Sequence, residues 1–81
     1  MQTDLEDFKT GWYGLTLGIN SHEIDELILA LKNLKKGKGH FHLSSNYEGK
    51  GGIGDIELYY MTERKESNMV LDMSPTIHTY K

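Results

Sequence analysis

Apolar residues recur along this chain with two different spacings, and each spacing predicts a type of element. Between Gly11 and Ile19 they occupy alternate positions, which predicts a strand with its apolar side chains on one face. Glycines on the opposite face indicate a close approach of another group or a bulge. From Ser21 to Gly37 the apolar residues recur three and four positions apart, the spacing of one buried helix stripe. That stripe consists of Ile24, Leu27, Ile28, Leu31 and Leu34.

The predicted helix has signals at both of its ends. Asn20 and Ser21 both suit the N-cap position, and Glu23 lies three residues after Asn20, where a capping box places its acceptor. Acidic residues gather in the first turns and lysines in the last, which matches the helix dipole. Gly37 is expected to end the helix.

Alternation returns after the helix and predicts three more strands. They cover His40 to Ser45, Ile53 to Met61 and Asn68 to Met73, and Pro75 is expected to end the last one. The segment from Asn46 to Gly52 between the first two is polar and rich in glycine, which is typical of a hairpin loop.

These elements predict an α+β fold with two layers. One helix packs on a mostly antiparallel four-stranded sheet, in the order β-α-β-β-β. Residues 1–10 show no clear period and are interpreted as an N-terminal arm, so residues 11–81 form a single α+β domain, whose last residues lie along a sheet edge or hang free. A single helix does not cover a whole sheet, so leftover aromatic residues such as Trp12, Tyr59 and Tyr80 suggest a homodimer or another partner.

Composition narrows the classes of function. A chain of 81 residues and 9.3 kDa has room for one core, and with no cysteine it has no disulfide, thiolate nucleophile or iron–sulfur ligand. The acidic start lacks the pattern of an export signal, and no apolar run is long enough for a membrane span, so a cytoplasmic protein is expected. A net charge of −3 disfavours nucleic acid and favours a basic partner.

The candidate chemistry lies in the predicted hairpin. If the apolar residues of its two strands share one face, the period of two puts His40, His42, Asp55 and Glu57 together on the other face. Two histidines and cross-strand carboxylates are suitable ligands for zinc or another divalent ion. The same alternation is typical of an ordinary solvated sheet face, which is the favoured interpretation.

Two catalytic interpretations use the same strands. In a hydrolytic one, Ser44 is the nucleophile, His42 or His40 the base and Asp55 the group that orients the base. In the other, Asp55 and Glu57 are a paired acid and base. An open sheet face offers neither a pocket nor oxyanion donors, so both are disfavoured and no catalytic residue is assigned.

Two binding motifs are also weak. Gly49, Gly51 and Gly54 match the G-x-G-x-x-G dinucleotide pattern, but they lead into a strand where that motif must open a helix, so no cofactor is expected. Lys50 in the same loop could contact an anion. An RNA-binding module would use the lysines of the helix end with Tyr59 or Tyr60 as stacking surfaces. Those lysines are Lys32, Lys35, Lys36 and Lys38.

Three segments resemble small bacterial immunity proteins of polymorphic-toxin systems. They are residues 21–27 (SHEIDEL), 40–43 (HFHL) and 55–58 (DIEL), from about the middle half of the chain. The resemblance implies a non-catalytic cytoplasmic protein that binds and neutralises a cognate toxin, and an acidic domain suits a basic toxin.

The leading hypothesis is therefore a non-catalytic protein that binds a protein partner through the polar sheet face and the glycine-rich loop. The alternative is a metal-binding or hydrolytic protein, and the second alternative is an RNA-binding module. The expected binding surface consists of His40, His42, Ser44, Lys50, Asp55, Glu57 and Tyr59.

Overall fold

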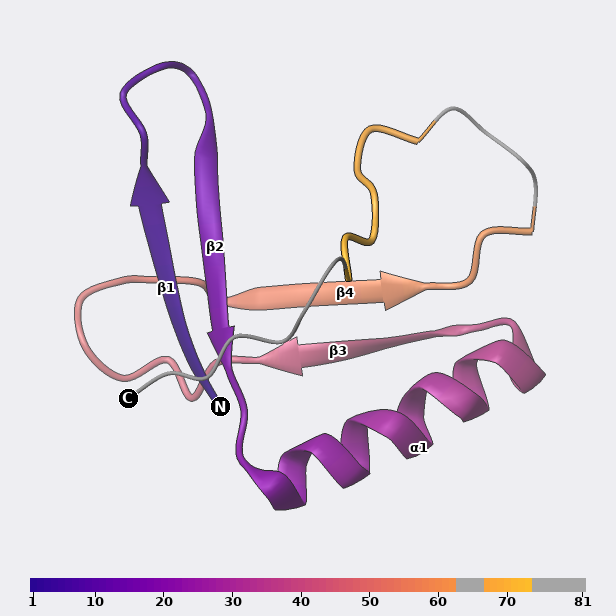
Figure 1. The fold of residues 1–81 in the computed structure, drawn as a ribbon. Coiled ribbons are helices and arrows are strands. Elements are labelled where there is room, and N and C mark those ends of the chain that lie inside the picture. Colours follow the sequence, from indigo (N-terminus) through magenta and orange to yellow (C-terminus); the bar gives the residue numbers. More distant parts are fainter. Residues whose placement is uncertain (63–66, 74–81) are drawn as a thin grey trace.

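A computed structural model describes residues 1–62 and 67–73 of this chain, which contain four strands and one helix (Figure 1). The elements are β1 (Gln2–Asp7), β2 (Tyr13–Gly18), α1 (Ser21–Gly37), β3 (His40–Ser44) and β4 (Asp55–Tyr59). The strands form two antiparallel pairs, β1 with β2 and β3 with β4. The predicted α+β class is confirmed, and so are the helix and the loop between the two strands that follow it.

Residues 1–10, interpreted from the sequence as an N-terminal arm, contain the strand β1. This strand pairs with β2 so that Thr3 lies opposite Leu17 and Leu5 opposite Leu15. β1 contains only one large apolar residue, so its sequence shows no alternation of apolar and polar residues. Its pairing with β2 makes it a strand. The close approach expected on the glycine face of β2 comes from Phe8, since a Cβ placed on Gly14 would lie 2.6 Å from its Cζ atom.

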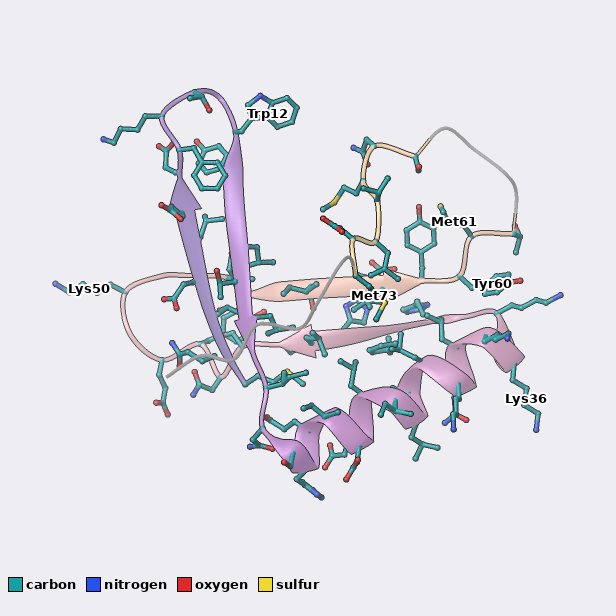
Figure 2. The ribbon with its side chains drawn as sticks, viewed as in Figure 1. Trp12, Lys36, Lys50, Tyr60, Met61 and Met73 are labelled. Atoms are coloured by element: carbon teal, nitrogen blue, oxygen red, sulfur yellow. The ribbon has the colours of Figure 1, made fainter. Side chains whose placement is uncertain are left out.

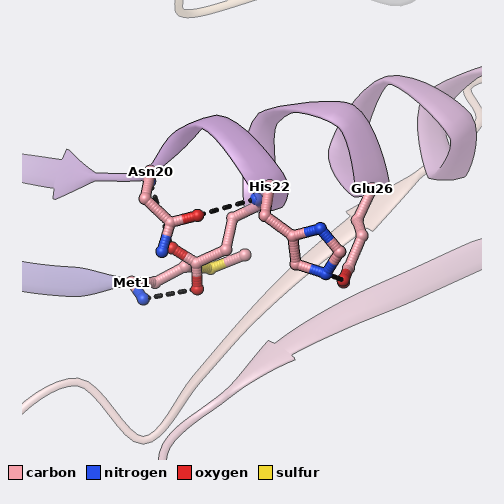
Figure 3. Close-up of polar contacts among 5 residues, drawn as sticks. Met1, Asn20, His22 and Glu26 are labelled. Carbon is pink, nitrogen blue, oxygen red and sulfur yellow. Dashed lines mark hydrogen bonds and ion pairs between the residues drawn. The ribbon is translucent and has the colours of Figure 1, made fainter.

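The start of α1 has the predicted capping box, and Asn20 is the residue that caps (Figure 3). Its Oδ1 accepts a hydrogen bond from the Glu23 backbone N–H at 2.9 Å, and Glu23 Oε1 accepts from the Asn20 N–H at 3.1 Å. Glu23 Oε2 also accepts a hydrogen bond from the Met1 ammonium at 2.6 Å. The start of β1 is thereby tied to the start of the helix. At the other end Gly37 is still helical, and the left-handed residue is Lys38, with φ 55°.

The strands β3 and β4 have the predicted parity. Phe41 lies opposite Leu58 and Leu43 opposite Ile56, and all four side chains are half-buried. Helix α1 lies along this hairpin and contacts β3 (Figure 1).

The predicted single sheet of four strands is not formed. Within the described residues each sheet has two strands, and the predicted strand from Asn68 to Met73 is irregular. Met69, Val70 and Leu71 are consecutive apolar residues flanked by Asn68 and Asp72, so the alternation is imperfect and the flanking residues disfavour strands. The predictions for the charged turn at 63–66, the stop at Pro75 and the tail at 76–81 lie outside the described residues.

The described residues do not close a core. None of their side chains is buried, and the chain exposes 8181 Å² of surface. A compact monomer of this mass exposes about 5,000 Å². The radius of gyration is 14.9 Å, compared with about 12 Å for a compact chain of this length. Figure 1 shows one reason, because the β1–β2 hairpin stands across the β3–β4 hairpin and extends beyond it. In the described part of the chain, no helix is long and apolar enough to cross a bilayer.

Candidate functional site

The polar face of the β3–β4 hairpin holds most of the residues that could perform chemistry. His42 lies opposite Glu57, and Asp55 is the diagonal neighbour of His42. His42 Nδ1 is 2.9 Å from Asp55 Oδ1 and 3.1 Å from Oδ2. Both side chains are about half exposed, at 41% and 46%. An exposed pair of this kind orients the imidazole ring but contributes little stability.

The ladder brings His42 and Glu57 closer together than an average cross-strand pair. Ser45 N donates to Gly54 O at 2.9 Å, which makes that pair a hydrogen-bonded one. Hydrogen-bonded and non-hydrogen-bonded pairs alternate, so the pair of His42 and Glu57, three positions along, is non-hydrogen-bonded. The Cα atoms of such pairs lie about 1 Å closer than those of the other kind.

His40 completes a group of three possible ligands. One donor atom from each of His40, His42 and Glu57 lies within 4.8 Å of the other two. The two imidazole rings meet edge to face, with centroids 5.2 Å apart and an interplanar angle of 89°. All three residues are exposed, so the group is open to solvent and to ions.

The remaining predicted residues divide into two groups. Ser44 and Tyr59 lie on the same exposed face, opposite Asp55 and His40 respectively. Lys50 does not join them: it lies in the loop before β4 and points away from the hairpin (Figure 2). The glycine-rich segment indeed leads into a strand, which removes the basis for a dinucleotide site.

The arrangement of Ser44, His42 and Asp55 differs from that of a hydrolytic triad. Ser44 Oγ donates to Asp55 Oδ1 at 3.5 Å, and His42 contacts the same carboxylate. In a triad the histidine lies between the nucleophile and the carboxylate. Here the carboxylate lies between the other two, so His42 is not placed to take the serine proton.

A cleft of about 690 Å³ lies on the opposite side of β3–β4, between this hairpin and the base of β1–β2. Its lining includes Leu5 and Leu17 from the first hairpin, and Leu43 and Ile56 from the second. Glu23 also lines it. The pKa of Glu23 is lowered below its usual value of 4.5. The main cause is the hydrogen bond from the N-terminal ammonium, and the second is the hydrogen bond from the Asn20 backbone N–H. The sequence did not predict this cleft, because it did not predict the strand at residues 2–7 that contributes to its lining.

A second surface is the apolar face of the β1–β2 hairpin, which the sequence predicted as one face of a strand but not as an exposed one. Leu5, Tyr13 and Leu15 share this face by the register of the ladder, and they are 58%, 63% and 49% exposed. Trp12, next to Phe8 at the tip of the hairpin, is 76% exposed (Figure 2) and by the same register belongs to the opposite face. β1 also carries three acidic residues in the sequence QTDLED. We call the surface formed by Leu5, Tyr13 and Leu15 the apolar hairpin face.

The residues of the RNA-binding alternative do not form one platform. Tyr59 is exposed on the polar face, whereas Tyr60 is half-buried. Lys38 Nζ lies 6.0 Å from the centroid of the Tyr60 ring. Lys36 extends into solvent at the end of α1 (Figure 2). The lysines in the last turn also complement the helix dipole without any ligand.

Comparisons of the chain with protein-family models, with curated proteins and with solved structures gave no match. Function is therefore inferred from the geometry and chemistry of the described residues.

Proposed function

We propose that this chain is a small, non-catalytic, cytoplasmic binding protein that completes its fold on a protein partner. The exposed surface carries this proposal: it exceeds that of a compact monomer of the same mass by about 3,000 Å². A permanent protein interface buries on the order of 1,000–2,500 Å² on each partner. The excess is larger than this, so one permanent interface would remove a large part of it from solvent.

The apolar hairpin face is the surface best suited to this contact. Exposed apolar patches of this kind mark interaction sites, and buried aromatic residues dominate the energy of interfaces. Tyr13 supplies an aromatic side chain to this face, and Trp12 supplies a second, exposed one at the tip of the hairpin. The sequence predicts the contact on the polar face of β3–β4 and its loop, but that face carries mainly polar and charged side chains.

Charge favours a basic partner. Asp7 lies on the apolar hairpin face opposite Tyr13, Asp4 and Glu6 lie on the other face of β1, and the whole chain has a net charge of −3. A partner with an apolar patch and a basic rim matches both features, and opposite charges raise the rate of association. A basic toxin neutralised by this chain is such a partner, and the resemblance to immunity proteins motivates that role.

The first test examines the isolated chain. We expect small-angle scattering to give a radius of gyration well above 12 Å, and the dye ANS to bind the exposed apolar surface. A compact monomer that unfolds cooperatively and does not bind ANS would contradict the proposal. A stable dimer in light scattering would show that a second copy fills this role in place of a basic partner.

The second test uses the protein encoded by the adjacent gene as the probe. We expect a one-to-one complex in native mass spectrometry, and rescue of growth when the two are co-expressed. Leu15→Asp places a charge on the apolar hairpin face and is expected to abolish the complex. Leu29→Asp is the matched control, because Leu29 is also an exposed leucine, at 60% compared with 49% for Leu15, but lies on α1. Equal loss in both variants, or recovery of RNA with the chain, would refute this role for the hairpin.

A further inference from the structure

We infer that the polar face of β3–β4 binds one divalent transition-metal ion of the zinc class through His40, His42 and Glu57. The site is independent of the apolar hairpin face and of the proposed partner, because it uses the other sheet. Two imidazoles and one carboxylate are a ligand set that zinc accepts.

The donors are near the separation that a metal requires. The donor atoms of a tetrahedral zinc site lie about 3.4 Å apart, which follows from metal–ligand bonds of about 2.0–2.1 Å. Here the three donors lie within 4.8 Å of one another before any ion is bound. All three side chains are exposed, so rotation about their own bonds can close the difference without moving the strands.

Backbone geometry already fixes the relative positions of the ligands. His40 and His42 are two residues apart on β3, so both project from the same face. Glu57 faces His42 across a non-hydrogen-bonded pair, where side chains come closest. An ion bound here connects β3 to β4, so it acts as a cross-strand link in a chain that has neither a disulfide nor a buried residue among those described.

Asp55 is a positioning residue for this site. Its carboxylate contacts Nδ1 of His42 at 2.9 Å, which orients the ring and leaves Nε2 as the nitrogen free to bind the ion. A carboxylate on the second nitrogen of a metal-binding histidine is a common feature of zinc sites. Three protein ligands leave a fourth position of the ion open to water.

The binding test uses the full chain prepared without a histidine tag. We expect calorimetry with zinc chloride to show one ion per chain and a rise in melting temperature. His40→Ala and Glu57→Gln should each weaken binding at least tenfold. His22→Ala is the matched control, since this histidine is exposed on α1 and pairs with Glu26 at 2.6 Å. Circular dichroism checks that each variant keeps its fold.

The role of Asp55 has a separate readout. Removal of such an outer carboxylate typically weakens metal binding about 10- to 100-fold. We expect Asp55→Asn to weaken cobalt binding by this amount and to shift its pH profile, while the visible bands of bound cobalt keep their positions because the ligands are unchanged.

Several outcomes would overturn the site. The wild type would show no zinc binding up to about 100 µM, or would bind one ion per two chains. Alternatively, His40→Ala or Glu57→Gln would keep the wild-type affinity for zinc, or His22→Ala would lose as much affinity as they do. An unchanged affinity and pH profile in Asp55→Asn would overturn the positioning role.

Discussion

The N-cap of α1 allows a direct test of how much one hydrogen bond contributes to the stability of this fold. In Asn20→Ala the helix loses the side-chain acceptor for the Glu23 backbone N–H, a hydrogen bond of 2.9 Å. The reverse bond, from the Asn20 N–H to Glu23 Oε1, uses the backbone and survives the substitution. Loss of an N-cap costs between about 0.5 and 2 kcal/mol. Because Asn20 is exposed and water can replace the lost acceptor, we expect about 1 kcal/mol.

The chain offers two matched controls for this substitution. Asn20→Asp keeps an acceptor at the cap, and Ser21→Ala removes the other residue that the sequence offered for this position. We expect both to change stability by less than about 0.5 kcal/mol. If Ser21 were the cap, the order of the costs would be reversed.

The assay is a urea titration followed by circular dichroism at 222 nm. With a urea slope of about 1 kcal/mol per molar, Asn20→Ala should move the midpoint down by about 1 M. The initial helix signal gives the same comparison if unfolding is not cooperative. A change below about 0.3 kcal/mol in Asn20→Ala, or an equal cost in Ser21→Ala, would refute the assignment of the cap.

Two other substitutions test the first hairpin and its link to the helix. The lowered pKa of Glu23 means that its carboxylate stabilises the fold at pH values above its usual value of 4.5, and that this contribution is lost as the pH falls through the folded-state pKa. In an acid titration followed by circular dichroism, the wild type should therefore lose more stability than Glu23→Gln as the pH falls. If the two titration curves are parallel, the contact of Met1 with Glu23 does not stabilise the fold. Gly14→Val should cost about 1 kcal/mol, because the new Cβ must displace the Phe8 ring. A double-mutant cycle should show that this cost disappears when Phe8 is Ala, and a cost that persists would place the clash elsewhere.

The sequence predicted best those features that depend on neighbouring residues. The capping box of α1 is set within one turn of chain, so it could be read directly. The apolar spacing predicted the helix but not its burial: none of the five stripe residues is buried, and Ile24, Ile28 and Leu31 are exposed. The parity of β3 and β4 was also predictable, because one-residue alternation fixes which side chains share a face. Parity alone therefore predicts that His40, His42, Asp55 and Glu57 share one face, without specifying which residues lie directly opposite one another.

The features that failed depend on distant partners. β1 has one leucine among acidic residues, so only its ladder with β2 makes it a strand. The single four-stranded sheet failed for a related reason, since alternation identifies a strand but does not say which strand it pairs with. The contact of His42 with Asp55 could not be read from sequence because a long loop separates β3 from β4 and leaves their register open.

The two proposed surfaces can be separated by experiment because they share no residue. Tyr13 and Leu15 belong to the sheet of β1 and β2, and the three candidate ligands belong to the sheet of β3 and β4. If the chain completes its fold on a partner, Leu15→Asp should abolish association and leave zinc affinity unchanged. If the ion links β3 to β4, Glu57→Gln should weaken zinc binding and leave association unchanged. Reciprocal effects would instead indicate one coupled surface, in which metal binding and partner binding stabilise the same folded state.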